Sequence, residues 1–208
     1  MRNGFIFNLD RCVNCKACSA ACLLENGWSV SARNIYTYNS EILPDLPVTN
    51  LSLTCNHCNK PLCLDGCPTG AYSKDDLTSA VLIDSEKCIG CRYCIWNCPY
   101  DAPKLNAGRG FIEKCNFCFS RINERVEPAC TAACPTGALQ FGGIPEISGS
   151  MELNWVPEKD INPALMITGT KNQSPLKIFS GPGLNEKRNE LCNDYKNDGC
   201  NEEPSKQW

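Results

Sequence analysis

The sequence has few aromatic residues, little net charge and no long apolar run. It contains no stretch of about 18 consecutive apolar residues, the least that a membrane-spanning helix needs. We therefore expect no direct membrane span. The net charge is −3, from 20 basic and 23 acidic residues, so neither nucleic acid nor an anionic lipid surface is expected as a main partner.

The start of the chain lacks the apolar stretch of a secretion signal and a pair of adjacent arginines. We expect the chain to carry no export signal of its own and to be assembled in the cytoplasm. If it functions across a membrane, the export signal of a partner takes it there. The partner then sets the side of the membrane.

Apolar material for a core is also scarce. Aromatic residues make up 8% of the 208 residues, and the 42% counted as hydrophobic includes 18 cysteines. A chain with so little apolar side-chain surface needs disulfides or metal to stabilise its fold. The cysteines therefore carry most of the information.

Sixteen of the 18 cysteines fall into four groups of four. The first and third groups have the spacing Cys-x-x-Cys-x-x-Cys-x-x-x-Cys of bacterial ferredoxins, and Pro99 closes the third. The second group has four residues between Cys58 and Cys63, and the fourth has eleven between Cys118 and Cys130. In chain order the groups are Cys12, Cys15, Cys18 and Cys22; Cys55, Cys58, Cys63 and Cys67; Cys88, Cys91, Cys94 and Cys98; and Cys115, Cys118, Cys130 and Cys134.

The tight spacing has a geometric reason. Three thiolates, each three residues after the last, can surround one cubane [4Fe–4S] cluster with backbone N–H groups turned toward its sulfides. The fourth cysteine cannot bend back to the remaining iron, so it binds a neighbouring cluster, and a following proline directs the chain away. Four such groups predict four [4Fe–4S] clusters in two cross-ligated pairs.

Three other uses of cysteine fit this pattern less well. A secreted disulfide scaffold needs an export signal, a zinc site needs only two Cys-x-x-Cys pairs, and a redox dithiol needs a single pair. The third cysteine of each tight group has no role in a zinc site. Zinc stays open as an alternative, and a colourless protein would identify it against a brown iron–sulfur protein.

The four groups form a duplicated pair of motifs. Residues 54–58 resemble residues 114–118, and residues 67–71 recur as 134–138. Such a repeat predicts quasi-twofold symmetry. We expect strands at Gly4–Leu9, Asn34–Tyr38, Val48–Leu53, Ala80–Asp84 and Gly110–Glu113, and helices at Ala17–Glu25 and Phe117–Val126.

The expected fold is α+β, with two ferredoxin-like lobes that each carry two [4Fe–4S] clusters. Residues 1–142 are assigned to this four-cluster domain. Residues 143–208 are rich in Asn, Pro, Lys and Glu, and we expect an extended C-terminal tail that docks on a partner or is partly disordered. One lobe is formed by the outer motifs, 12–22 and 115–134, and the other by the inner motifs, 55–67 and 88–98.

Four further residues need an interpretation. His57, the single histidine, lies inside the second group, where four cysteines already complete the ligand set. We expect it to be a hydrogen-bonding or solvent-facing neighbour rather than a ligand. Trp96 lies inside the third group and is expected to shield a cluster from water rather than to relay electrons. Cys192 and Cys200 stand outside the groups and are expected to be free thiols, with a disulfide between them as the alternative.

With its irregular second and fourth groups, the sequence resembles the iron–sulfur subunits of the dimethyl sulfoxide reductase and polysulfide reductase family of molybdopterin oxidoreductases. The resemblance covers about residues 4–142 by motif, and more loosely residues 155–158 and 161–164. An ordinary two-cluster ferredoxin has neither of the wide spacings.

The resemblance implies which cysteines share a cluster. Some relatives replace one cysteine of the third group by tryptophan and carry a [3Fe–4S] cluster. Cys91 is present here, so four [4Fe–4S] clusters are implied. The implied sets are Cys12, Cys15, Cys18 and Cys134 (cluster 1); Cys22, Cys115, Cys118 and Cys130 (cluster 2); Cys55, Cys58, Cys63 and Cys98 (cluster 3); and Cys67, Cys88, Cys91 and Cys94 (cluster 4).

By resemblance the protein is a non-catalytic electron-transfer subunit. Family members relay electrons between a molybdenum- or tungsten-pterin catalytic subunit and a membrane subunit that exchanges electrons with quinone. A peripheral, membrane-associated location within such a complex is implied. The lobe with Cys12 and Cys115 would face the catalytic subunit, and the lobe with Cys55 and Cys88 the membrane subunit. The alternative is a free-standing soluble polyferredoxin that shuttles electrons between enzymes, which a co-purifying large subunit would exclude.

Overall fold

The structure is a computed structural model and describes residues 2–28, 30–38, 48–144 and 161–169. Its helices and strands are short, and the longest described helix has 10 residues. The content is mixed α and β, as the sequence predicts. The elements are β1 (Arg2–Asn8), α1 (Ala17–Asn26), β2 (Asn34–Tyr38), β3 (Thr49–Leu53), α2 (Leu62–Asp65), β4 (Tyr72–Lys74), β5 (Val81–Ile83), α3 (Tyr93–Asn97), β6 (Lys104–Asn106), β7 (Phe111–Glu113), α4 (Phe119–Asn123), α5 (Ala129–Ala132), β8 (Leu139–Ile144) and β9 (Leu165–Thr168).

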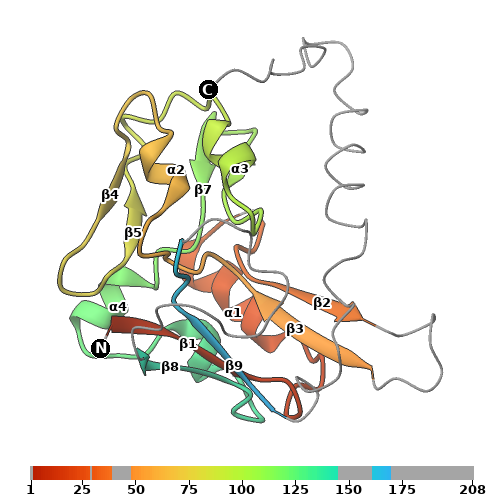
Figure 1. The fold of residues 1–208 in the computed structure, drawn as a ribbon. Coiled ribbons are helices and arrows are strands. Elements are labelled where there is room, and N and C mark those ends of the chain that lie inside the picture. Colours follow the sequence, from red (N-terminus) through yellow and green to blue (C-terminus); the bar gives the residue numbers. More distant parts are fainter. Residues whose placement is uncertain (1, 29, 39–47, 145–160, 170–208) are drawn as a thin grey trace, which may run out of the picture.

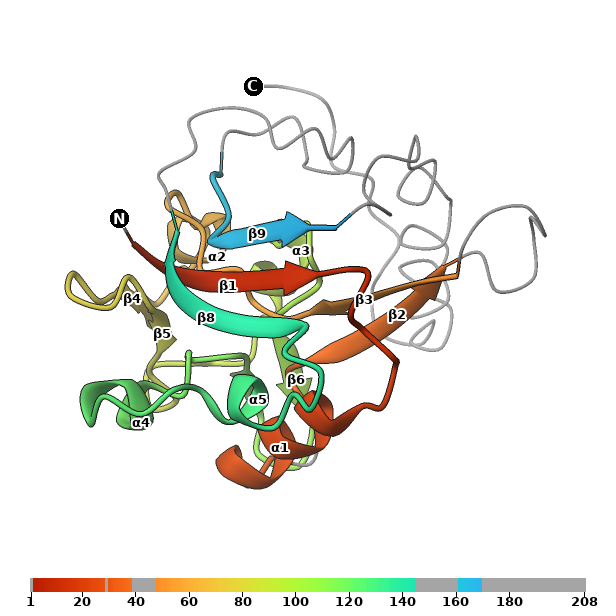
Figure 2. The ribbon, with the colours of Figure 1, turned by 90° about the horizontal axis from the view of Figure 1, so that it is seen from below.

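Three strands form the largest described sheet, in the order β8-β1-β9 (Figure 2). The central strand β1 pairs antiparallel with β8 and parallel with β9, so Phe5 lies opposite Phe141 on one side and Leu165 on the other. Gly4 permits this packing, because a Cβ at this position would lie 2.7 Å from the carbonyl oxygen of Ala164. Both edges of β1 are therefore covered by neighbouring strands.

The strand β9 comes from the C-terminal segment that the sequence predicts to have little core of its own. Its region contributes Ile161, Leu165 and Ile167, which are all buried with 7% or less of their surface exposed. The free edge of β1 offers backbone hydrogen bonds, and the alternating apolar side chains of β9 cover the core. The described part of this segment thus completes the sheet, while residues 145–160 and 170–208 lie outside the described residues.

Three two-stranded hairpins, β2–β3, β4–β5 and β6–β7, make up the other described strands. The hairpins β2–β3 and β6–β7 are each followed, after one residue, by the first cysteine of a wide motif. In both, the first residue of one strand pairs with the last residue of the other, Asn34 with Leu53 and Lys104 with Glu113. The duplicated sequence therefore folds into duplicated local structure.

The expected strands are confirmed, with shifts of one or two residues at most ends. The helix expected over residues 117–126 is shorter than predicted, because α4 covers only Phe119–Asn123. Phe117 and Cys118 have φ angles of 62° and 51°, which a right-handed helix cannot include. The cysteine motif, rather than helix propensity, thus decides where α4 begins.

Most of the buried hydrophobic residues form two clusters, which we name the larger core and the smaller core. The larger core gathers side chains from β1, α1, β3, α5, β8 and β9, and its aromatic centre includes Phe5 and Phe117, with ring centroids 5.2 Å apart. Elements of the smaller core lie in the upper part of Figure 1 and those of the larger core below them. The smaller core consists of Cys63, Tyr72, Val81, Cys94 and Ile112.

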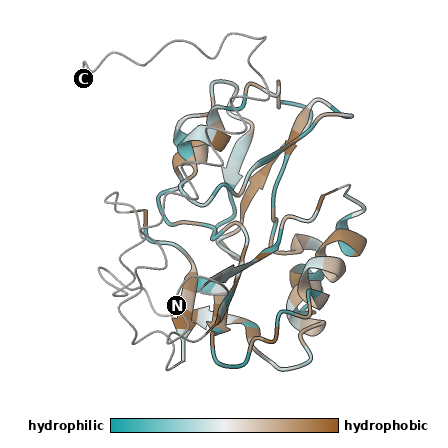
Figure 3. Cartoon of the chain, turned by 90° about the vertical axis from the view of Figure 1, so that its right-hand side faces the viewer, coloured by the Kyte–Doolittle hydropathy of each residue, from teal (hydrophilic) through white to brown (hydrophobic). Residues whose placement is uncertain are grey.

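Hydrophobic and hydrophilic residues are mixed along the ribbon in both parts of the molecule (Figure 3). None of the helices in the described ranges is both long and apolar enough to cross a membrane. Several exposed apolar side chains lie next to cysteines instead. Val13 follows the first cysteine of the sequence, and Ile89, Tyr93 and Trp96 lie within the third group.

Candidate metal centres

The sixteen grouped cysteines all lie within the described residues, and none of them forms a disulfide there. Cys15 is exposed at the tip of the first tight motif. Cys192 and Cys200, expected to be free thiols, lie outside the described residues. Short helices position five buried cysteines: Cys18 and Cys22 on α1, Cys63 on α2, Cys94 on α3 and Cys130 on α5.

The loops of the two tight motifs share an unusual backbone. Asn14 and Gly90, each two residues after the first cysteine, have φ angles of 56° and 68°. Lys16 and Arg92, each four residues after it, have φ angles of 60° and 67°. Left-handed residues that alternate with ordinary ones turn backbone N–H groups toward one side and form a concave surface for an anion. Both tight motifs therefore suit a negatively charged cluster with thiolate ligands.

The two wide motifs also repeat their backbone. His57 and Phe117, each two residues after the first cysteine, have φ angles of 40° and 62°. Both side chains are fully buried, and their rings stack with centroids 3.5 Å apart and 26° between the planes. The matching residues of the two wide motifs therefore contact each other. The second and fourth cysteine groups are thus in direct contact.

His57 is a hydrogen-bonding residue and does not face solvent. The backbone N–H of Val81 donates to His57 Nδ1 at 2.9 Å. Burial, followed by the positive charges of Lys114 and Arg33, lowers the pKa of His57 well below its ordinary value. The imidazole is therefore neutral, with its proton on Nε2. This Nε2 and the amide Nδ2 of Asn56 are buried with no hydrogen-bond partner among the described residues, so these donors suit the sulfides of a cluster.

The last cysteine of each wide motif accepts a backbone hydrogen bond. The N–H of Ala71 lies 3.4 Å from Cys67 Sγ, and the N–H of Leu139 lies 3.4 Å from Cys134 Sγ. Burial raises the pKa of both thiols, but hydrogen bonds from a threonine hydroxyl and from backbone N–H groups outweigh it and lower the pKa. Both sites favour the thiolate, which is the form that binds metal.

Around the larger core, thiols of the first and fourth groups lie together. Burial raises the pKa of Cys12, and nearby thiolates of both groups raise it further. Burial also raises the pKa of Cys118 to about 11. The charged thiol neighbours of Cys12 are Cys18, Cys134 and Cys15, and those of Cys118 are Cys130 and Cys22.

Thiols of the second and third groups also lie together, at the boundary of the two cores. Cys55 is buried in the larger core, with Cys58 and Cys98 packed against it, whereas Cys63 and Cys94 belong to the smaller core. Burial and neighbouring thiolates raise the pKa of Cys58 far above its ordinary value. Burial raises the pKa of Cys94, while the nearby hydroxyl of Tyr72 opposes the increase. The charged thiol neighbours of Cys58 are Cys55, Cys98 and Cys63, and those of Cys94 are Cys88 and Cys91. These neighbours support the implied ligand sets, which stay a prediction.

The chemistry of the donors fits iron–sulfur clusters. In the part of the sequence that the structure describes, no three Cys, His, Asp or Glu side chains converge closely enough to hold a single metal ion. A cubane does not require such convergence, because each cysteine binds a different iron of the cluster. The donors in each group are all sulfur, which suits iron–sulfur chemistry and not the oxygen-binding cations Mg²⁺ or Ca²⁺.

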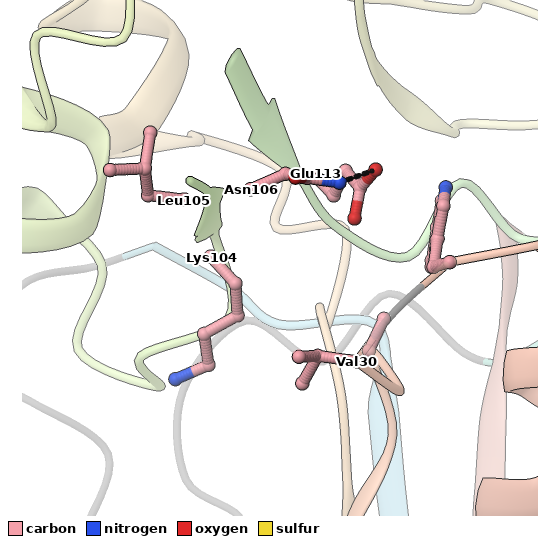
Figure 4. A pocket seen from close by; sticks show the side chains of 7 residues that line it. Val30, Lys104, Leu105, Asn106 and Glu113 are labelled. Atoms are coloured by element: carbon pink, nitrogen blue, oxygen red, sulfur yellow. Dashed lines mark hydrogen bonds between the residues drawn. The ribbon is translucent and has the colours of Figure 1, made fainter. Parts of the chain in front are cut away.

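A small hollow opens elsewhere on the described surface. Figure 4 shows its side chains from β6 and β7, among them Leu105, Asn106 and Glu113, opposite Val30. Asn106 Nδ2 donates to a carboxylate oxygen of Glu113 at 2.8 Å. The lining contains no cysteine, histidine or serine. We therefore assign the hollow no catalytic role, and the chemistry of the described residues belongs to the cysteine motifs.

Two residues near the sulfur atoms were missed by reasoning from the sequence. Arg33 and Lys114 are 1% and 2% exposed, although both carry a positive charge. The only sequence signal is that Lys114 directly precedes a cysteine. Arg11 and Lys87 also directly precede cysteines and are exposed, so this signal alone does not distinguish a buried cation.

Paired groups of sulfur donors on a duplicated scaffold define the class of the protein. It is a ferredoxin-like iron–sulfur protein, whose chemistry is electron transfer. Residues 47–144 match the family described as "4Fe-4S dicluster domain". That match covers the second, third and fourth cysteine groups.

Similar proteins narrow the class further. The sequence is 41% identical to "Probable anaerobic dimethyl sulfoxide reductase chain YnfG" of Escherichia coli (strain K12) over 154 residues, which are 69% of this chain and 75% of that protein. It is 39% identical over 155 residues to the B subunit of anaerobic dimethyl sulfoxide reductase from Haemophilus influenzae, with the same shares. It is also 35% identical over 156 residues to "Thiosulfate reductase electron transfer subunit PhsB" of Salmonella typhi, which are 73% of this chain and 79% of that protein. The protein belongs to the family of iron–sulfur subunits that includes the B subunit of anaerobic dimethyl sulfoxide reductase.

Proposed function

We propose that this protein relays electrons through four [4Fe–4S] clusters between a molybdenum- or tungsten-pterin catalytic subunit and a quinone-reactive membrane subunit. Its relatives are named as chains or subunits of reductases, which favours this function over a free-standing polyferredoxin. A catalytic partner follows from this family. The membrane subunit, and a peripheral, membrane-associated location through the complex, are parts of the proposal.

In this proposal two ferredoxin-like lobes carry two clusters each. The outer motifs supply the ligands of one lobe, around the larger core, and the inner motifs supply those of the other lobe, whose third set has Cys55 in the larger core and Cys63 in the smaller core. The ligand sets are Cys12, Cys15, Cys18 and Cys134; Cys22, Cys115, Cys118 and Cys130; Cys55, Cys58, Cys63 and Cys98; and Cys67, Cys88, Cys91 and Cys94.

The observation that carries the proposal is the continuity of the sulfur groups. Burial raises the pKa of Cys115, and the thiolate of Cys55, which belongs to the next proposed set, raises it further. Cys94 is likewise among the charged neighbours of Cys63, which joins the third set to the fourth. Cys18 and Cys22, of the first and second sets, are one helical turn apart on α1. These neighbours support electron transfer along a chain of clusters, which we call the wire, in the order first set, second set, third set and fourth set.

Residues of this protein exclude water from the wire and stabilise its sulfur ligands. The clusters, when bound, supply one-electron transfer. The stacked pair His57 and Phe117 excludes water between the second and third sets, since both side chains have no exposed surface. Backbone N–H groups of the motif loops point at sulfur, which stabilises the anionic ligands.

Exposed apolar side chains support contact surfaces at both ends of the wire. Val13, beside the first set, is 63% exposed. At the other end, Ile89 is 67% exposed, and Tyr93 and Trp96 pack edge to face with centroids 5.5 Å apart while each keeps about half of its surface exposed. Apolar groups left in water next to a redox centre suit a protein partner. We assign the Val13 end to the catalytic subunit and the Ile89 end to the membrane subunit, and the shielding role of Trp96 stays a prediction.

Purification of the tagged full-length protein from its native cells under anaerobic conditions tests this function. We expect on the order of sixteen iron and sixteen acid-labile sulfide per molecule, from four cubanes. A large subunit that contains molybdenum or tungsten should co-purify. A brown monomer without a large subunit would favour the free-standing polyferredoxin, and stoichiometric zinc with little iron would refute the clusters themselves.

A further inference from the structure

Two cations are buried without acidic partners near the proposed clusters. Arg33 and Lys114 are 1% and 2% exposed, and neither forms an ion pair within the described residues. Burying a charge without a counter-charge is strongly unfavourable. Some negative charge must therefore compensate for them in the assembled protein.

The two cations occupy matching places in the duplicated fold. Arg33 directly precedes β2, and Lys114 directly follows β7. One further step of each hairpin register places Arg33 across from Thr54 and Lys114 across from Pro103. Each of these hairpins thus carries one buried cation at the end next to its cysteine motif, but on opposite strands. Both hairpins therefore have a buried positive charge at this end, but the first strand provides it in one hairpin and the second strand in the other.

Arg33 is fixed between the first and second sulfur sets. Its Nη1 donates to Ser52 Oγ at 3.1 Å, and this same hydroxyl lies 3.5 Å from Cys18 Sγ of the first set. Its Cζ lies 4.2 Å from the centroid of the Phe5 ring. Its Nη2 is buried with no hydrogen-bond partner in the described residues. Burial alone would lower the pKa of Arg33, but surrounding thiolates outweigh it and raise the pKa. These thiolates are Cys130, Cys115, Cys18 and Cys22.

Lys114 has the corresponding place beside the third set. Its Nζ donates to the carbonyl oxygens of Val81 and Cys115 and lies 5.9 Å from the centroid of the Tyr72 ring. Burial and the neighbouring Cys55 raise the pKa of Cys63, and the charge of Lys114 acts against them. Val81 and Tyr72, which the Lys114 ammonium contacts, pack with Cys63 in the smaller core, so Lys114 lies close enough to this sulfur set to stabilise negative charge on it.

We propose that Arg33 raises the reduction potentials of the first and second clusters and that Lys114 raises the potential of the third. This inference rests on the proposed function. A cluster that accepts an electron becomes more negative, so a fixed buried cation stabilises its reduced form. The effect is large because the interior screens charge weakly, whereas water and salt screen an exposed cation. Both residues act through the field and touch no reacting substrate.

The sequence offers a matched control for this test. Lys87 directly precedes Cys88 as Lys114 directly precedes Cys115, but 63% of the Lys87 side chain is exposed. We compare Arg33→Gln, Lys114→Gln and Lys87→Gln in the anaerobically purified full-length protein, with its partners where they co-purify. Redox titration followed by electron paramagnetic resonance gives the midpoint potential of each cluster. Each buried cation should change the reduced-to-oxidised ratio of its own clusters on the order of tenfold, a fall of about 59 mV for a one-electron couple, while Lys87→Gln leaves all potentials unchanged.

Charge-conserving variants separate the field from the packing. Arg33→Lys and Lys114→Arg should keep potentials close to those of the unmodified protein, because the charge remains. Equal shifts in the charge-conserving and neutral variants would overturn the proposal, as would neutral variants that shift no more than Lys87→Gln. If a glutamine variant fails to assemble, Arg33→Met or Lys114→Met replaces it, since methionine fills similar space without charge.

Loss of iron from every neutral variant, with iron retained in Arg33→Lys and Lys114→Arg, would assign the cations to cluster assembly and overturn their proposed role in setting potentials. Failure of the proposed function is separate from these outcomes. It shows in the unmodified protein, as missing iron or as the absence of a large subunit, before any variant is measured.

Discussion

The two cores differ in how much protein surrounds the cysteines that they contain. Among the described residues the larger core has 21 buried residues and the smaller core has five. The larger core is built on a three-stranded sheet and the ten-residue helix α1. The smaller core has only three-residue strands and helices of four and five residues. Elements that short are not stable alone.

The difference shows what stabilises each part. Three phenylalanines, Phe5, Phe117 and Phe141, pack edge to face in the larger core with centroids 5.1 to 5.6 Å apart. Two of the five buried side chains of the smaller core, Cys63 and Cys94, are expected cluster ligands. The smaller core therefore depends more on its metal than the larger core does.

Removal of iron should have the largest effect and should separate the two cores. We expect chelation to unfold residues 1–142, because ligand binding supplies much of the folding free energy of such a protein. The smaller core should lose its hydrogen-exchange protection first. A native-like circular dichroism spectrum of the apo-protein, or simultaneous loss of protection in both cores, would contradict this comparison.

Removal of β9 should weaken the larger core alone. A truncation after Ile144 keeps β8 whole and removes Ile161, Leu165 and Ile167, and each buried aliphatic side chain contributes about 1.5–3 kcal/mol. A truncation after Gly169 keeps β9 and serves as the control. The truncation after Gly169 should leave the iron content and the denaturant midpoint unchanged. It should weaken binding to the large partner, because we expect the residues beyond Gly169 to belong to a docking arm. Equal stability of the two truncated proteins would show that β9 contributes little.

A smaller change at the same sheet should show how closely its strands fit. In Gly4→Ala the new Cβ would lie 2.5 Å from Ile144 Cδ1 and 2.7 Å from the Ala164 carbonyl oxygen. We expect a loss of about 1–3 kcal/mol in the free energy of unfolding, from overpacking. The cross-strand partner Gly142 is the matched control, because a Cβ there meets nothing within 4 Å. Urea unfolding measures both, and a Gly142→Ala effect as large as that of Gly4→Ala would exclude this explanation.

The smallest expected change is the loss of one iron from one cluster. Cys91 and Cys15 are the second cysteines of the two tight motifs. Cys91→Trp and Cys15→Trp should each convert one cubane to a [3Fe–4S] cluster, because the bulky apolar side chain leaves one iron without its thiolate. Electron paramagnetic resonance of the oxidised protein detects the three-iron cluster. Four intact cubanes in Cys91→Trp would show that Cys91 is not a ligand.

The sequence alone determined the kind of chemistry. Thiolate ligands at short, regular spacing act locally, so the four groups, the iron–sulfur class and the duplicated motifs could be read directly from residues such as Cys88 to Cys98. The strands β1, β2, β3, β5 and β7 were predictable for the same reason, since alternation and turn residues are local signals, whereas β4, β6, β8 and β9 were not predicted. The predicted start of a helix at Phe117 was wrong, because the motif loop imposes a left-handed backbone at Phe117 and Cys118.

Only the tertiary structure decided the contacts between distant segments. The pairing of β9 with β1, the stacking of His57 on Phe117 and the burial of Arg33 and Lys114 join residues far apart in the sequence. A single sequence carries no signal for them, because a strand of four residues, a histidine or a lysine beside a cysteine is equally compatible with an exposed position. The charge of Lys114 is buried and that of Lys87 is exposed, because the folded protein brings different surfaces together around them. Burial in turn determines the strength of the electrostatic field of each charge.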